Sequence, residues 1–162
     1  MLLRLARFFS SMLSQFLKKL VALQPMRRLF PGLETPESME GYARDIAGAI
    51  SRQEALCAEE NGTVCGVLAF SRAENELAFL AVSGQHRRRG IARQLAERMF
   101  RELDPTRPVR LITYREGIPE GEAARALYQE LGFCPGELVE VEGSPAQEFL
   151  RPADNSERSV SE

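Results

Sequence analysis

Cysteine, histidine and tryptophan are scarce in this chain. Its 162 residues include three cysteines, one histidine and no tryptophan. An odd number of cysteines without close pairing argues against a disulfide framework or a zinc site. We therefore expect Cys57, Cys65 and Cys134 to be reduced thiols of a cytoplasmic protein, and we expect no metal. Cys57 and Cys65 fall in predicted strands, where a cysteine behaves as a small buried hydrophobe.

Long hydrophobic runs and low-complexity segments are also missing. No uninterrupted apolar run is long enough to span a bilayer. The apolar fraction of 44% and the charged fraction of 27% are ordinary for a soluble globular protein, and the length suits one domain. We expect that domain over residues 1–151. The tail, residues 152–162, has no apolar periodicity and is predicted to be disordered.

The chain lacks a strong overall charge, but its charge is unevenly distributed. The net charge is −2, residues 1–33 carry six basic side chains and no acid, and the remainder therefore carries −8. A domain that binds duplex nucleic acid is expected to be basic. We accordingly expect no nucleic-acid partner.

Two common phosphate-binding motifs are absent: G-x-x-x-x-G-K-[ST], and G-x-G-x-x-G at the start of a helix. In their place, an apolar strand (77–82) leads into the turn SGQHRRRG (83–90), and an amphipathic helix (91–103) follows. The first amides of a helix have no partner within it and attract anions, and Gly90 allows a ligand to approach the backbone. This arrangement predicts a phosphate or pyrophosphate site.

Two motifs resemble those of a known family. Residues 87–92, RRRGIA, resemble the [QR]-x-x-G-x-[GA] signature of the GNAT superfamily of acyl-CoA-dependent N-acyltransferases. Residues 124–133, ARALYQELGF, resemble the family's A-x-x-L-Y-x-x-x-G-F. Without the second motif, a solvated basic turn would be the preferred interpretation. The resemblance implies an α/β (α+β) fold with a mixed, mostly antiparallel central sheet flanked by helices.

The resemblance also implies the site. The turn would hold the pyrophosphate of coenzyme A, pantetheine would insert between strands 77–82 and 109–114, and the amide near Val82 would polarise the thioester. Tyr128 matches the family tyrosine that donates a proton to the leaving thiolate. The residues predicted to bind the coenzyme are Ala81, Val82, Arg87, Arg88, Arg89, Gly90, Ile91, Ala92, Arg125 and Tyr128.

No general base stands out from the sequence. Glu76 and Tyr114 are candidates, and Glu76 is our choice as the second catalytic residue beside Tyr128. His86 lies in the pyrophosphate turn, where packing or a phosphate contact is favoured over proton transfer. Gly121 departs from the family, which often has a pantetheine-contacting asparagine there.

Three neighbouring residues are candidates to replace the asparagine: Glu120, Glu122 and Arg125.

Local signals predict the remaining elements. Asn61-Gly62 predicts a hairpin between strands 55–59 and 63–70. A helix is predicted to begin at Pro36 after a Thr35 cap, and another to run from about Gly121 to a stop at Gly132. A C-terminal hairpin is predicted from strands 137–142 and 148–151. For the N-terminus, a strand (2–8) and a helix ending before Pro25 are preferred to one basic amphipathic helix.

These observations predict an N-acetyltransferase that transfers an acetyl group from acetyl-CoA to a primary amine of a small molecule, peptide or protein in a ternary complex. Two alternatives stay open: a non-catalytic module that binds or senses acyl-CoA, and membrane or partner docking through the N-terminal segment. The expected partners are acetyl-CoA and the amine. We expect no membrane association, and a homodimer stays open.

Overall fold

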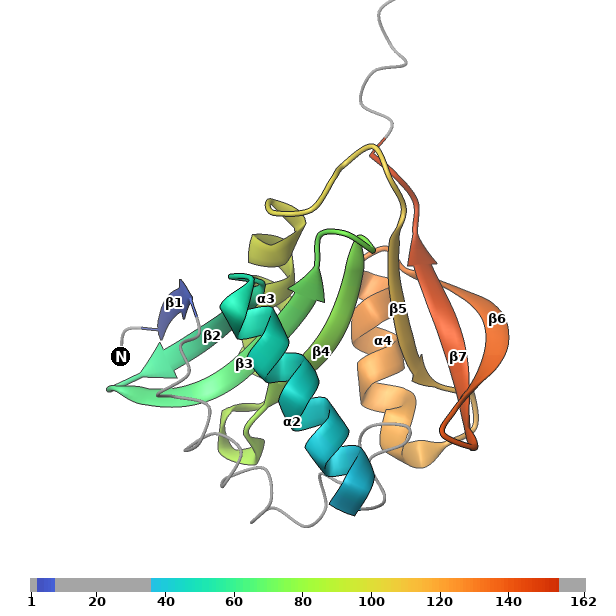
Figure 1. Ribbon diagram of the computed structural model, residues 1–162, viewed down its shortest axis with the longest axis horizontal. Coiled ribbons are helices and arrows are strands. Elements are labelled where there is room, and N and C mark those ends of the chain that lie inside the picture. Colours follow the sequence, from blue (N-terminus) through green and yellow to red (C-terminus); the bar gives the residue numbers. More distant parts are fainter. Residues whose placement is uncertain (1–2, 8–35, 155–162) are drawn as a thin grey trace, which may run out of the picture.

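A mixed seven-stranded sheet forms the framework of the protein (Figure 1). The computed structural model describes residues 3–7 and 36–154. The order of strands across the sheet is β1-β2-β3-β4-β5-β7-β6. Its strands are β1 (Leu3–Arg7), β2 (Ala55–Glu60), β3 (Thr63–Ser71), β4 (Glu76–Val82), β5 (Val109–Tyr114), β6 (Cys134–Val141) and β7 (Ser144–Arg151). Its helices are α2 (Pro36–Ser51), α3 (Ile91–Phe100) and α4 (Glu122–Glu130), with 3-10 turns η2 (Gly84–His86) and η3 (Pro119–Gly121).

Every pair of neighbouring strands is antiparallel except β4 and β5, which are parallel. The predicted fold class, a mixed and mostly antiparallel sheet flanked by helices, is therefore confirmed. The β2–β3 hairpin also turns where expected. Asn61 and Gly62 have φ of 51° and 74°, and positive φ at both central residues is the mark of a type I′ turn.

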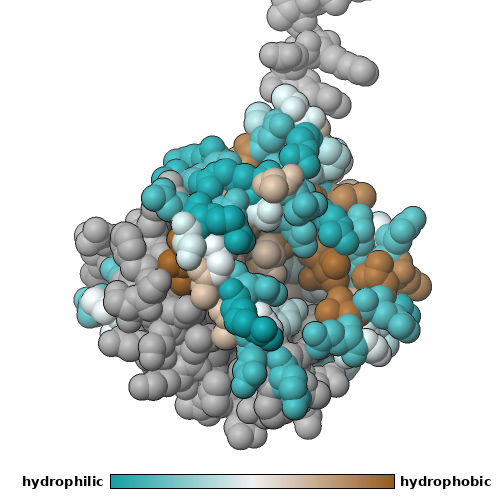
Figure 2. All heavy atoms as spheres, viewed as in Figure 1, coloured by the Kyte–Doolittle hydropathy of each residue, from teal (hydrophilic) through white to brown (hydrophobic). Residues whose placement is uncertain are grey.

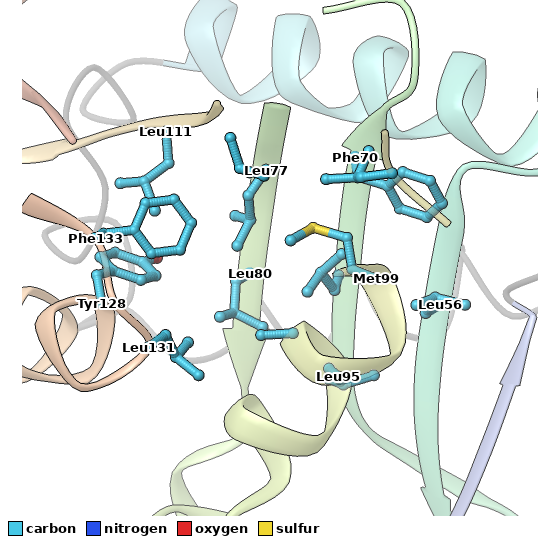
Figure 3. Packing of buried hydrophobic residues seen from close by; sticks show 14 of the residues in the cluster. Leu56, Phe70, Leu77, Leu80, Leu95, Met99, Leu111, Tyr128, Leu131 and Phe133 are labelled. Atoms are coloured by element: carbon cyan, nitrogen blue, oxygen red, sulfur yellow. The ribbon is translucent and has the colours of Figure 1, made fainter. Parts of the chain in front are cut away.

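Helices cover both faces of the sheet. α2 packs on one face through Ile46 and Ala49, which are 2% and 3% exposed. The core on the other face, shown in Figure 3, is filled by Leu95 and Met99 of α3 together with side chains of the strands and α4. Because successive residues of a strand point to opposite faces, β2 and β3 contribute side chains to both cores. The strands that carry the site are thus held from both sides.

A glycine allows α3 to lie close to the sheet. A Cβ atom built on Gly66 of β3 would lie 3.0 Å from Ile91 Cγ2 and 3.2 Å from Leu95 Cδ1. These distances are tighter than ordinary van der Waals contact, so a larger residue would push away the first turn of α3. The close packing fixes where that turn lies relative to β3 and β4.

β4 and β5 separate after a single bridge. The parallel pairing between them consists of Glu76 with Arg110, although β4 extends to Val82 and β5 to Tyr114. The strands diverge beyond that point (Figure 1). β4 remains paired with β3 along its other edge, up to Val82. Within the described residues, no ladder therefore joins β4 to β5 beyond Glu76.

Asn75 stabilises the point where the two strands meet. It is 0% exposed and has φ of 52°. Its Nδ2 donates to the carbonyls of Asp104, Arg107 and Pro108 at 3.1–3.2 Å, and its Oδ1 accepts from the Asp104 amide at 2.9 Å. Its own carbonyl accepts from the Arg110 amide at 3.1 Å. One side chain thus joins the β3–β4 turn to the loop before β5.

The C-terminal hairpin is longer than predicted. β6 and β7 begin at Cys134 and Ser144, whereas the alternating sequence pattern indicates strands from 137 and 148. The ladder has an irregularity between Pro135 and Leu138. Pro135 and Gly136 have low strand propensity, so the sequence does not predict that β6 begins before residue 137. β7 also pairs with β5, from Ala146 to Arg151.

The N-terminal prediction is only partly within the described residues. β1 pairs antiparallel with β2, as the strand interpretation expects. The helix predicted between that strand and Pro25 lies outside the described residues, as does most of the C-terminal tail. Among the described helices, none is both long and apolar enough to span a membrane.

The face seen in Figure 2 is largely hydrophilic, and hydrophobic side chains gather toward β5, β6 and β7. Leu138 of β6 is 62% exposed. The C-terminal hairpin therefore carries the most exposed of the large hydrophobic side chains in the described part of the chain.

Candidate active site

A cleft of about 860 Å³ is lined by β4, the turn after it, the start of α3, and parts of β5 and α4. Its position follows from the divergence of β4 and β5, because no ladder closes the space between them. The cleft brings together most of the residues predicted from the sequence. These are Glu76, Ala81, Val82, Arg87, Arg88, Gly90, Ile91, Ala92 and Tyr128.

The turn between β4 and α3 has the backbone of an anion site. Gly90, the residue before the first turn of α3, has φ of 75° and provides no side-chain cap. Arg88 is also left-handed, with φ of 60°. The first amides of α3 therefore donate no hydrogen bond to a capping side chain. Free amides at a helix start, together with a turn of mixed handedness, form a concave set of donors suited to a phosphate.

The three arginines of the turn have different surroundings. Arg87 and Arg88 line the cleft, whereas Arg89 is not among its lining residues. Arg89 Nη2 instead lies 2.7 Å from Glu60 Oε1 on β2. Arg87 and Arg88 form no ion pair with the described residues, which leaves two positive charges beside the helix start.

His86 also lines the cleft, and both of its ring nitrogens have partners within the protein. Nδ1 lies 2.6 Å from Ser83 Oγ, and Nε2 lies 3.0 Å from Glu60 Oε2. These contacts agree with the expectation of a structural or phosphate-contacting role, since a free nitrogen would be needed to accept a proton from an amine.

Tyr128 lies on α4 at the wall of the cleft and is 6% exposed. Its ring packs edge-on against Phe133 and Phe149, with centroids 6.0 and 6.4 Å apart. Figure 3 shows Tyr128 across from Leu80 of β4. Burial raises the pKa of Tyr128 to about 12, so the phenol keeps its proton at neutral pH. No side chain or backbone group in the described parts of the chain hydrogen-bonds to its hydroxyl.

Glu76, the first residue of β4, lines the cleft at the point where β4 meets β5. Its carboxylate lies 3.5 Å from Arg110 Nη1, and Arg110 is shared with Glu148 at 3.1 Å. Burial raises the pKa of Glu76; Arg110 opposes this rise, and the nearby Glu74 and Glu148 add to it. A carboxylate with a raised pKa is a stronger base than an ordinary one, which suits proton abstraction.

Gly121 has a packing reason for departing from the family pattern. A Cβ atom built at Gly121 would lie 2.3 Å from the Cβ of Tyr114, so no larger residue fits there without movement. Tyr114, the other candidate base, is 6% exposed and does not line the cleft. Of the two glutamates considered as replacements for the missing asparagine, Glu120 lines the cleft and Glu122 does not.

Arg125 lies outside the cleft lining and is 8% exposed. Its Nη1 donates to the Tyr114 carbonyl at 2.8 Å and to Gln147 Oε1 at 2.7 Å, and its guanidinium lies 4.8 Å from the centre of the Phe149 ring. These contacts tie α4 to β5 and β7. They favour a structural role over the predicted contact with the coenzyme.

Two residues near the cleft were not predicted from the sequence, Tyr42 and Glu60. Tyr42 of α2 lines the cleft and packs against Phe79 of β4, with ring centroids 6.2 Å apart. Burial raises its pKa, and the charges of Glu142 and Asp45 raise it further. Glu60 holds two residues of the turn. Neither contact has a local signal, because the partners come from elements far apart in the sequence.

The cleft therefore has two chemically different ends. Arg87 and Arg88 stand by free amides at the turn, while Glu76 lies where β4 and β5 meet. Such a cleft can hold a long ligand with an anionic end near the turn. Among residues 3–7 and 36–154, no group of three or more His, Cys, Asp or Glu side chains is placed to hold a metal ion.

Comparison with solved structures supports the fold. The acetyltransferase PaiA of Thermoplasma acidophilum, solved in complex with coenzyme A, is 18% identical, with 94% of this chain and 99% of that chain covered and a TM-score of 0.67. A GNAT-family acetyltransferase of Bacillus cereus is also 18% identical, with coverage of 94% and 98% and a TM-score of 0.67. An N-acetyltransferase of Staphylococcus aureus is 16% identical, with coverage of 94% and 99% and a TM-score of 0.68.

Comparison of the sequence itself assigns the family. A search of curated proteins found no match. The family model described as "Acetyltransferase (GNAT) domain" matches residues 51–135, which include the hairpin, β4, the turn, α3, β5 and α4. The match spans the strands and turn that form the cleft, as well as both sequence motifs. The chain belongs to the GNAT family of acetyltransferases.

Proposed function

We propose that this protein transfers the acetyl group of acetyl-CoA to a primary amine by direct attack within a ternary complex. The observation that carries the proposal is the single bridge between β4 and β5, which opens a cleft with free helix amides at the turn and a buried phenol in its wall. None of the three cysteines forms a disulfide in the described part of the chain, which supports a reducing, cytoplasmic setting.

The coenzyme would lie along the edge of β4 that faces β5, where no ladder joins the two strands beyond Glu76. Its pyrophosphate would accept hydrogen bonds from the first amides of α3, with Arg87 and Arg88 adding positive charge. Its pantetheine amides would pair with the backbone at the Val82 end of β4, in the manner of an added strand. This orientation directs the thioester toward the part of the cleft that holds Tyr128 and Glu76.

The reaction forms one bond and breaks another. The amine nitrogen attacks the thioester carbon, whose oxygen is polarised by a backbone amide near Val82, and the C–S bond of the resulting tetrahedral intermediate then breaks. Glu76 accepts the proton of the amine, directly or through water. Coenzyme A leaves as a thiolate that is hydrogen-bonded by Tyr128. The N–C bond of the amide product remains.

The pKa of Tyr128 defines what it contributes. Burial raises the pKa of Tyr128 to about 12, above the pKa of about 8.5 of an ordinary thiol, so the phenol holds its proton tightly. Donation of a hydrogen bond to the developing thiolate leaves that proton on the phenol. Tyr128 therefore stabilises the leaving group as a donor, and the thiol receives its final proton from the amine by way of Glu76 or solvent.

A screen of amines tests the proposal. Polyamines, free lysine and short peptides with free amino termini are incubated with acetyl-CoA, and release of the coenzyme thiol is followed. We expect amine-dependent release by the wild type and none by Gly90→Glu. Binding of acetyl-CoA without turnover on any amine would favour the alternative of a sensing module.

A further inference from the structure

Glu60 stands outside the cleft, yet it contacts the turn that forms one end of it. We propose that Glu60 is a positioning residue for the coenzyme pyrophosphate, because it holds His86 and Arg89 on either side of the two arginines that face the cleft. This inference rests on the proposed function, in which the turn binds acetyl-CoA. It adds a residue of β2 to a site otherwise built from β4, β5, α3 and α4.

The contacts of Glu60 span the turn. Glu60 is the last residue of β2, and its side chain is 10% exposed. Oε1 lies 2.7 Å from Arg89 Nη2, and Oε2 lies 3.2 Å from Arg89 Nη1 and 3.0 Å from His86 Nε2. Both carboxylate oxygens are therefore committed to the turn. On the other side of the imidazole ring, Ser83 Oγ lies 2.6 Å from His86 Nδ1 and extends this set of hydrogen bonds.

The backbone between these two anchors is strained. Arg88 has φ of 60°, a conformation that L-residues other than glycine rarely adopt, and Gly90 follows at 75°. Such a conformation persists only where its surroundings determine it. His86 lies two residues before Arg88 and Arg89 lies one residue after it, so the Glu60 carboxylate holds both sides of the strained residue. Release of either anchor would allow the turn to relax and its amides to lose their common direction.

The same contacts give the three arginines of the turn different roles. A carboxylate beside an anion site would ordinarily repel the ligand. Here Arg89 and His86 occupy the carboxylate, and their hydrogen bonds and charges outweigh the effect of burial, so the pKa of Glu60 lies below its usual value. Arg89 is drawn to β2, while Arg87 and Arg88 line the cleft. Glu60 thus separates the arginine that holds the turn from the two that meet the ligand.

The order Ser83, His86, Glu60 resembles a hydrolytic triad, but the geometry does not support that function. Ser83 does not line the cleft, whereas its neighbours Val82 and His86 do. Ser83 also precedes η2, and its carbonyl accepts a hydrogen bond from the His86 amide at 2.9 Å. These contacts make Ser83 part of the turn's support. A nucleophile would have to reach the thioester inside the cleft.

Glu60→Gln tests the proposal because it removes the charge and keeps the shape of the side chain. Affinities for acetyl-CoA and for S-acetylpantetheine, which lacks the pyrophosphate, are measured by ligand-observed NMR up to millimolar concentrations. We expect at least a ten-fold weaker affinity for acetyl-CoA and an unchanged affinity for S-acetylpantetheine. Glu59→Gln, which removes the same charge from the adjacent position, should leave both affinities at the wild-type values.

A second variant keeps the proposal testable if Glu60→Gln fails to fold. Arg89→Gln breaks the ion pair from the turn side, and we expect it to weaken acetyl-CoA binding in the same way. Both changes break the same ion pair between Glu60 and Arg89. The double variant should therefore bind acetyl-CoA no more weakly than the single variant with the lower affinity. Thermal melting shows whether each variant is folded.

The outcomes separate this inference from the proposed function. Wild-type affinity for acetyl-CoA in a folded Glu60→Gln protein would overturn the positioning role and leave the proposed function intact. An equal loss for both ligands would also overturn it, because a defect confined to the pyrophosphate turn spares S-acetylpantetheine. A wild type that binds neither ligand would instead contradict the proposed function itself.

Discussion

At the residue scale, the hydroxyl of Tyr128 is expected to support turnover without adding to stability. The phenol hydroxyl has no hydrogen-bond partner in the described parts of the chain, so its removal breaks no hydrogen bond within the folded protein. Tyr128→Phe should therefore melt at or above the wild-type temperature. Its turnover should fall by roughly 10²-fold with little change in acetyl-CoA affinity, because the leaving thiolate loses its donor. Unchanged turnover would place Tyr128 in the core alone.

Also at the residue scale, Glu76 gives a pH dependence with a definite sign. Burial raises its pKa above 4.5, so kcat/KM should rise with pH as the folded-state carboxyl ionises. Glu76→Gln should lower kcat/KM and abolish the part of the rise at low pH, while the rise from deprotonation of the acceptor amine at higher pH remains. An unchanged rise at low pH in Glu76→Gln would assign the base elsewhere.

The same shift affects stability. Because the folded state holds the Glu76 proton more tightly, folding favours the protonated carboxyl, and the wild type should lose stability relative to Glu76→Gln as pH rises from 4.5 through the folded pKa. Chemical denaturation of both proteins across this range measures the difference. A wild type that gains relative stability with rising pH would show that Arg110 outweighs burial at this site.

At the element scale, Asn75 holds the β3–β4 turn against the loop before β5. Asn75→Ala would strip partners from three carbonyls and one amide and would place alanine at φ of 52°. We expect a loss of roughly 3 kcal/mol, or a melting temperature lower by about 6–12 °C. Asn75→Gly loses the same bonds without the φ penalty and should be less destabilised. A neutral Asn75→Ala would mean that this junction does not limit stability.

Elements with local signals could be predicted from the sequence. Asn61-Gly62 marks the hairpin, Pro36 marks the start of α2, and Gly132, with φ of 91°, ends the helical segment that contains α4. Contacts between distant elements have no such signal. Glu60 and Arg89 are 29 positions apart, as are Asn75 and Asp104, and only the fold brings them together.

At the scale of the whole molecule, the two motifs of the sequence meet because β4 and β5 diverge. The basic turn follows β4 and Tyr128 follows β5, so the cleft between the strands has one motif at its end and the other in its wall. The sequence order of the motifs predicts that both belong to the site. The placement of Arg89 and Arg125 outside the cleft lining could not be predicted, because it depends on partners in β2, β5 and β7.

In the proposed function, acetyl-CoA binds in this cleft through the turn before α3. Calorimetric titration of acetyl-CoA into the wild type and Gly90→Glu tests it most directly. Gly143→Glu is the matched control, because Gly143 has a similar φ of 80° and lies in the β6–β7 turn. We predict micromolar binding by the wild type and Gly143→Glu and none by Gly90→Glu. Absence of wild-type binding, or equal binding by all three proteins, would contradict the account.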